Sequence, residues 1–195
     1  YSELFQNYNR EQIEGYAQFF LDTSLNLGTL VNFAETHDNN RLAGSGKNFS
    51  ILRTLLRALL SDCGAYGITC GVEWLAEEKI DVHNCSCLNW DSEDNIKYTV
   101  KSAVRVITNH PCFQAGTRRR FIHSGSENSL ALLRHAPGGE KLLILSNLDS
   151  GNESSVQWSW EDFSCKDDTL VNLLTESEKD FCMENHTAKV RLSPG

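Results

Sequence analysis

The chain has 195 residues, of which 40% are hydrophobic and 23% are charged, so it can bury a core and is not a largely disordered protein. Its 26 acidic residues outnumber its 18 basic ones and give a net charge of −8, so a nucleic-acid-binding surface is not expected. The sequence contains no run of eighteen apolar residues, and we therefore expect no membrane-spanning segment.

Helical and β-prone segments alternate in the first part of the chain. Residues 10–22 place apolar side chains on one helical face, and residues 29–35 form a short β-prone run. Residues 48–62 are the strongest helix candidate, residues 65–73 are β-prone, and residues 95–109 have helical spacing again. This alternation is typical of βα units around a parallel sheet.

The periodicity changes after the basic run at residues 118–120. Short β-prone segments separated by Gly, Pro, Ser and Asp turn signals then follow one another, at residues 119–124, 129–136, 141–148, 154–160, 168–174 and 188–193. This pattern predicts an antiparallel sandwich or meander. We therefore expect an α/β fold followed by an all-β fold, divided into residues 1–117 and 118–195.

The cysteines indicate a reduced protein without a metal centre. There are seven of them, so at least one thiol has no partner within the chain, which slightly favours a cytoplasmic location. Cys85 and Cys87 lack a second ligand pair at zinc-site spacing, so we predict no metal and no other cofactor. Four Asn-x-Ser/Thr sequons, which matter only in a secreted eukaryotic protein, begin at Asn48, Asn84, Asn152 and Asn185.

Two motifs accompany the β-prone runs of the first part. His37 and Asp38 directly follow the first run, and Arg41 lies three residues beyond the aspartate. The second run, taken from Gly64 to Glu73, has glycine at positions 64 and 71 and glutamate at position 73. These motifs resemble the fourth conserved region and the eighth barrel strand of the α-amylase family of glycoside hydrolases, and the loop at 88–95 resembles that family's tryptophan-bearing loop.

This resemblance covers nearly the whole chain in order. It implies that residues 1–117 are the last strands and helices of a (β/α)8 TIM barrel, and that residues 118–195 are a C-terminal antiparallel β-sandwich domain. Tyr66 stands where the eighth-strand motif usually has proline, and a Tyr-Gly pair at this point is closer to maltosyltransferases.

The resemblance also implies roles for the first motif. Active sites of such barrels lie at the carboxyl ends of the strands, where His37 and Asp38 are expected. By similarity, Asp38 is the catalytic aspartate that binds sugar hydroxyls and stabilises the oxocarbenium-like transition state, and His37 binds the same sugar. The alternative is that Asp38, with the two asparagines after it, is a polar turn that ends a strand.

Four further residues are candidates for substrate binding, each with a structural alternative. Arg41 orients Asp38, reaches a neighbouring sugar, or is the structural partner of a carboxylate. Glu73 either touches sugar or stabilises its loop. Trp74 and Trp90 either stack on sugar rings or contribute to packing.

The nucleophile and the general acid of the family are absent. No arginine is followed two residues later by aspartate, which is the family's nucleophile motif, and a complete barrel needs roughly 250 residues. We therefore expect the chain to depend on an upstream part of the same barrel and to be inactive alone.

The expected substrate is an α-glucan or maltooligosaccharide, cleaved with retention. Two alternatives stay open: a maltosyltransferase or glucanotransferase of the same family, and a non-catalytic amylase-like heavy chain of an amino-acid transporter, which the four sequons would suit.

Overall fold

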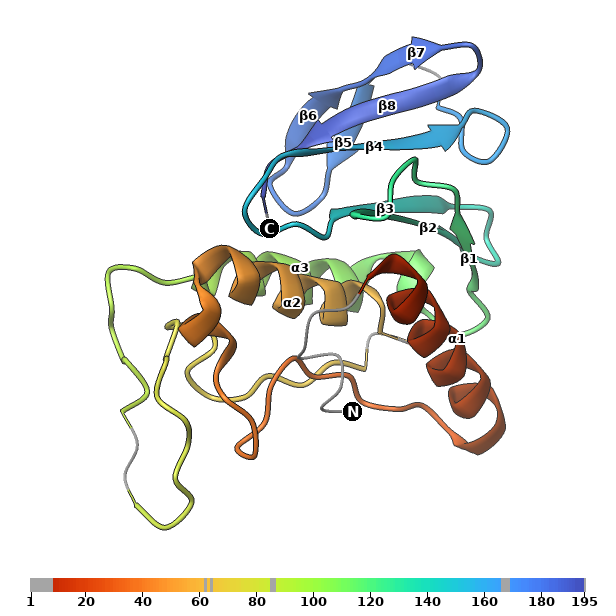
Figure 1. Cartoon of the computed structure of the whole chain (residues 1–195). Coiled ribbons are helices and arrows are strands. Elements are labelled where there is room, and N and C mark those ends of the chain that lie inside the picture. Colours follow the sequence, from red (N-terminus) through yellow and green to blue (C-terminus); the bar gives the residue numbers. More distant parts are fainter. Residues whose placement is uncertain (1–8, 62, 64, 85–86, 166–168, 195) are drawn as a thin grey trace.

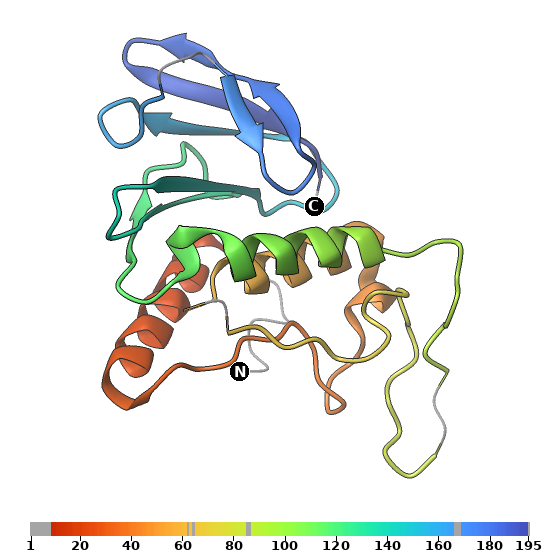
Figure 2. The same ribbon diagram turned by 180° about the vertical axis from the view of Figure 1, so that it is seen from behind.

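A computed structural model describes residues 9–61, 63, 65–84, 87–165 and 169–194. Its layers are visible in Figures 1 and 2: one sheet lies between a pair of helices and a second group of strands. The α-helices of the described part are α1 (Arg10–Leu27), α2 (Lys47–Leu59) and α3 (Lys97–Asn109), and the 3-10 helices are η2 (Leu42–Ser45) and η3 (Pro111–Phe113). No helix in these ranges combines the length and apolar composition needed to cross a bilayer.

The antiparallel strands all come after residue 117, as predicted. One sheet has the order β1-β2-β3, formed by Arg118–Ile122, Ser129–His135 and Lys141–Asn147. A second sheet has the order β4-β8-β7, formed by Ser154–Ser159, Thr187–Leu192 and Cys182–Glu184, and β5 (Thr169–Asn172) pairs with β6 (Ser177–Asp180) as a separate hairpin. Strands β6 and β7 were not predicted, because the exposed residues of Ser177–Asp180 and Cys182–Glu184 lack apolar alternation.

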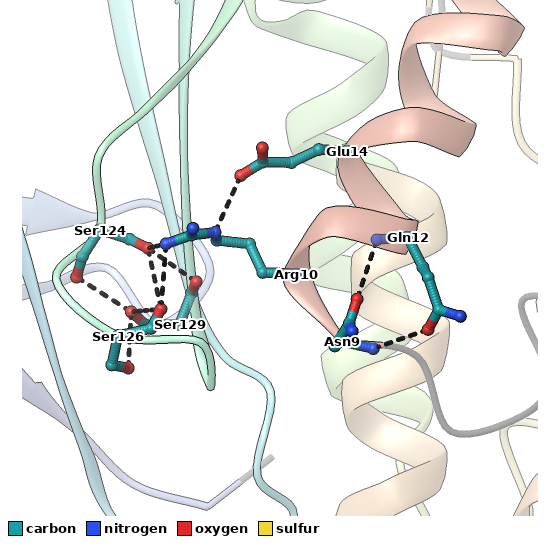
Figure 3. A network of polar contacts seen from close by, with 7 residues as sticks. All are labelled: Asn9, Arg10, Gln12, Glu14, Ser124, Ser126 and Ser129. Carbon is teal, nitrogen blue, oxygen red and sulfur yellow. Dashed lines mark hydrogen bonds and ion pairs between the residues drawn. The ribbon is translucent and has the colours of Figure 1, made fainter.

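Helix α1 begins with a capping box and continues beyond the predicted end at residue 22. The side chain of Asn9 accepts a hydrogen bond from the backbone N–H of Gln12, and the Gln12 side chain accepts one from the N–H of Asn9 (Figure 3). The additional turn ends at Gly28, whose φ of 122° is accessible to glycine and whose N–H bonds the carbonyl of Ser24.

Helix α1 is also tied to the β-layer. Nη1 of Arg10 donates to the backbone carbonyl of Ser126 at 3.3 Å and to Oγ of Ser124 at 3.5 Å, in the turn between β1 and β2 (Figure 3). Nε of the same arginine lies 3.4 Å from a carboxylate oxygen of Glu14. The N-terminal helix therefore contacts strand connections more than a hundred residues later in the chain.

The helices and the first sheet share one hydrophobic core. Ile13 and Phe20 of α1 and Leu56 of α2 are buried in the same cluster as Leu130 and Ile144 of the sheet. The opposite face of this sheet packs against the second sheet around Trp158, Val156 and Val190. Burial of apolar surface on both faces explains why the six residues Ser129–Arg134 of β2 are all buried.

Arg134 of β2 crosses the boundary between the sheet and the helices. Its guanidinium donates to three backbone carbonyls: Leu59 at 2.8 Å, Ser61 at 3.1 Å and Cys112 at 2.8 Å. The same group lies 4.0 Å from the ring centroid of Phe113. The side chain is 1% exposed, so these bonds are made in the interior.

The two β-prone runs of the first part do not form regular strands. They meet in a single parallel bridge, between Asn32 and Tyr66. Parallel strands are stable when neighbouring strands and helices cover them, and the described residues supply no further strand beside this pair. The expected partial TIM barrel is therefore not shown by this structure, whereas the helices and the antiparallel sheets are.

Candidate functional site

A buried ion pair closes the loop that carries His37 and Asp38. Nε and Nη2 of Arg41 each lie 2.7 Å from Oε1 of Glu35, and both side chains are almost completely buried. The other carboxylate oxygen of Glu35 accepts the backbone N–H of Leu42 at 2.7 Å. Residues 35 and 41 are thus held together, and the residues between them form an exposed loop.

His37 and Asp38 lie together at the tip of this loop. Nε2 of His37 is 3.4 Å from Oδ1 of Asp38, and the two side chains are 57% and 80% exposed. The backbone below them is ordered by Thr36, whose hydroxyl accepts the N–H of Asp38 at 3.2 Å and donates to Oδ1 of Asn39 at 2.8 Å. An exposed carboxylate beside an imidazole can accept and donate hydrogen bonds to a hydroxylated ligand, and the same geometry also satisfies the polar-turn alternative.

Arg41 does not reach toward Asp38 or solvent. Besides Glu35, its Nη2 donates to the backbone carbonyl of Cys70 at 2.9 Å. Of the three roles considered for Arg41, the geometry matches the structural partner of a carboxylate. The residue that sequence reasoning missed is this carboxylate, Glu35, because a single carboxylate six residues before its arginine forms no recognisable pattern in the sequence.

The second motif lies alongside the loop. The backbone N–H of Asn32 bonds the carbonyl of Ala65 at 2.9 Å, and the N–H of Gly67 bonds the carbonyl of Asn32 at 2.7 Å. The hydroxyl of Thr69 donates to the carbonyl of Glu35. These bonds hold the two predicted motif segments side by side.

Glycine is required at position 71, where the segment passes Arg41. Gly71 has a φ of 92°, and a Cβ atom there would lie 3.1 Å from Nη2 of Arg41 and 3.0 Å from the side chain of Ala76.

Tyr66, in the second motif, has a raised pKa. The main cause is burial of its hydroxyl, and the second is the negative charge of Glu35. The buried carboxylate thus influences both motif segments.

Glu73 stabilises its own loop. Its Oε2 accepts the backbone N–H of Gly71 at 3.1 Å, and its carbonyl accepts the N–H of Ile96 at the start of α3 at 2.9 Å. These contacts match the structural alternative considered for Glu73. Gly64, which opens this motif, lies outside the described residues.

Trp74 and Trp90 form an aromatic pair at the surface. Their ring centroids are 6.2 Å apart at an interplanar angle of 62°, and Trp90 is 61% exposed. The carbonyl of Trp74 accepts a hydrogen bond from the side chain of Asn89 at 2.8 Å, and Nζ of Lys97 lies 4.9 Å from the Trp74 ring centroid. The open face of Trp90 offers an apolar platform with polar groups nearby, as stacking on a sugar ring requires.

The cysteines and acidic residues give no indication of a metal. Four described cysteines are free thiols, namely Cys70, Cys87, Cys112 and Cys182, and Cys85 lies outside the described residues. Within the described ranges, no three His, Cys, Asp or Glu side chains are grouped closely enough to hold a metal ion.

Comparison with known proteins identifies the fold. No protein-family model matches the sequence, and neither does any curated protein. Solved structures do match: a maltogenic α-amylase from Thermotoga neapolitana with a TM-score of 0.70, and an α-amylase from Lactobacillus plantarum with a TM-score of 0.62. An Anoxybacillus α-amylase matches with a TM-score of 0.73.

Each of these structures is 16% identical in sequence to this chain, and each covers between 92% and 99% of it. The chain spans only 42–43% of the length of these structures. Nearly the whole chain therefore has the fold of the corresponding part of α-amylases. A sequence identity of 16% supports no assignment of activity or substrate.

Proposed function

We propose that the chain is the C-terminal part of a retaining glycoside hydrolase of the α-amylase family that acts on α-glucans. Residues 1–117 are then the end of the catalytic barrel, and residues 118–195 are its C-terminal β-domain. The observation that carries the proposal is the Glu35–Arg41 pair, which presents His37 and Asp38 to solvent in a chain with the α-amylase fold.

Asp38 supplies transition-state stabilisation in this proposal. Its carboxylate accepts hydrogen bonds from sugar hydroxyls, and these bonds strengthen as the reacting ring flattens toward the oxocarbenium-like transition state. His37, 3.4 Å away, donates a further hydrogen bond to the same sugar. The nucleophile and the acid come from the upstream part of the barrel, so the 195-residue chain alone releases no sugar.

Trp90 and Trp74 contribute binding of the glucan chain. An exposed indole can cover the apolar face of a glucose unit, and Trp74 packs against Trp90 in an edge-to-face arrangement. Arg41 and Glu73 act through the backbone that they hold rather than by touching the glucan.

Two experiments test the proposal at different levels. In affinity electrophoresis through amylopectin, the 195-residue chain should be retarded, and Trp90→Ala should lose this retardation. Phe19→Ala, which removes an exposed aromatic ring from α1, is the matched control and should keep it. Mobility that is equal with and without amylopectin would contradict glucan binding.

The second experiment uses the chain joined to its upstream barrel. Asp38→Asn keeps the size of the side chain and removes its charge, so turnover should fall about a hundred- to a thousand-fold, which corresponds to about 2.7–4 kcal/mol. Asn40→Ala in the same exposed loop is the control and should retain turnover. Turnover of a folded Asp38→Asn enzyme within a few fold of the parent would return the loop to the polar-turn interpretation.

A further inference from the structure

An apolar cavity lies between the β-layers and the helices. Its volume is about 420 Å³, and its wall combines β3, the β5–β6 hairpin, the end of β8 and the facing ends of α2 and α3. Pockets that hold small molecules usually measure roughly 300–1,000 Å³. In Figures 1 and 2 the helices α2 and α3 separate the β-layers from the segment that carries His37 and Asp38, so the cavity is distinct from the proposed glucan site.

The position of β3 explains why the cavity is apolar. Strand β3 is one of the two edge strands of its sheet, and its side chains Leu142, Leu143 and Leu145 are only half-buried, whereas Ser129–Arg134 of the neighbouring β2 are buried. These leucines belong to both faces of the strand, and all three line the cavity. The surface that β3 leaves unburied therefore lines a partly open cavity rather than packing against another strand.

The hairpin opposite β3 is anchored, so the cavity is already formed. Arg105 of α3 donates to the backbone carbonyl of Leu173 at 3.0 Å and forms an ion pair with Glu176, which holds the turn after β5 against the helix. Leu170 of β5 packs against the core between the sheets, and Leu173 packs against the core shared with the helices. A preformed cavity needs little rearrangement to accept a ligand.

The charge of the cavity wall differs from that of the whole chain. The chain has a net charge of −8, yet the described residues that line the cavity include Lys141 and Lys179 and no aspartate or glutamate. Neither lysine forms an ion pair with another described residue. Strand alternation directs Glu178 and Asp180 to the face of β6 opposite to that of Lys179.

We propose that this cavity binds a long-chain carboxylate of the fatty-acid class. The hydrocarbon chain occupies the space beside Leu142, Leu145 and Leu170, and the carboxylate pairs with Lys141 or Lys179 at the rim. A glucan suits this wall less well, because sugar hydroxyls need several convergent polar partners. Of the uncharged polar side chains in the wall, His110 and Asn172 already accept the backbone N–H groups of Cys112 and Leu174. A polypeptide strand added along β3 needs no unpaired lysine, and the charge of the wall therefore favours the carboxylate.

Titration calorimetry of the 195-residue chain with octanoate, decanoate and dodecanoate, each below its micelle-forming concentration, tests the proposal. The dissociation constant should fall about fourfold for each added methylene group that becomes buried. Absence of binding by all three, or affinity that does not depend on chain length, would overturn it.

Two double variants that each remove two positive charges distinguish binding in the cavity from nonspecific binding of the carboxylate. The double variant Lys141→Gln, Lys179→Gln should weaken decanoate binding at least tenfold and leave binding of decan-1-ol unchanged. The matched control Lys101→Gln, Lys189→Gln removes the same charge from α3 and β8 outside the cavity wall and should bind decanoate like the parent. An equal loss of decanoate affinity in both double variants would overturn the proposal. Absence of decanoate binding combined with self-association of the chain in light scattering would also overturn it.

Discussion

Replacing Arg41 with methionine should destabilise the chain strongly. The arginine makes two contacts of 2.7 Å with Glu35 and one hydrogen bond of 2.9 Å with the carbonyl of Cys70, all in the interior. Arg41→Met fills much of the volume but leaves the Glu35 carboxylate, which is 2% exposed, without its cation. Breaking a buried pair in this way typically costs about 3–5 kcal/mol. For a chain of this length the melting temperature should fall by about 6–20 °C.

Thermal and urea unfolding, followed by circular dichroism, measure the effect. The double variant Glu35→Leu, Arg41→Met removes both charges and should recover most of the loss, because an apolar pair of similar volume often replaces a buried ion pair without cost. The control is Arg191→Met, whose partner Glu153 is 3.8 Å away at the surface, and it should change stability by no more than about 1 kcal/mol. If Arg41→Met changed stability no more than Arg191→Met, the Glu35–Arg41 pair would not be what holds the loop.

Three further outcomes follow from the structure. Arg134→Met should cost at least about 3 kcal/mol in urea unfolding, because two buried carbonyls and one partly buried carbonyl lose their donor, and Arg134→Lys should not restore it. Burial lowers the pKa of His110 below its ordinary 6.5, so the unfolded chain binds the proton more readily and stability should fall as the pH drops below about 6.5. His110→Asn keeps an acceptor for the N–H of Cys112 and should remove this fall in unfolding midpoints measured from pH 7.5 to 5. Deleting residues 118–195 should expose the apolar faces of α1 and α2, with aggregation and dye binding as readouts; a soluble remainder with the parent's melting temperature would contradict the shared core.

The elements that local periodicity defines were predictable from the sequence. The three α-helices lie where apolar spacing indicated them, and each of the six predicted antiparallel segments contains a strand with an apolar residue facing a core. One of these segments, residues 168–174, begins within the part that is not described and contains β5. The end of α1 was placed five residues too early, because Gly28, with its positive φ, and not residue 22 ends the helix.

The candidate site was predictable in its positions and not in its contacts. The exposed His37–Asp38 loop lies beside the second motif as the order of segments indicated, but the roles of these residues remain predictions. Glu35 was not singled out, because one buried carboxylate six residues before its arginine leaves no periodic trace in a sequence. The parallel strands were expected from the alternation of helical and β-prone segments and from the family resemblance. Two such runs do not by themselves supply the neighbouring strands that parallel pairing requires.

Arg134 also has a consequence for the order in which the chain folds. The carbonyl of Leu59 is the last of helix α2, where the helix macrodipole is negative, and a buried cation there is favourable. This cation comes from strand β2, 75 residues later in the chain, so the last turn of α2, which carries Arg57 itself, gains this second cation and the hydrogen bond to Leu59 only when the sheet has docked. Contacts of such long sequence separation form late and slow the folding of a chain. During synthesis from the N-terminus, the final turn of α2 therefore receives its hydrogen bond from Arg134 only after β2 has been made. This couples the folding of α2 to that of the β-layer.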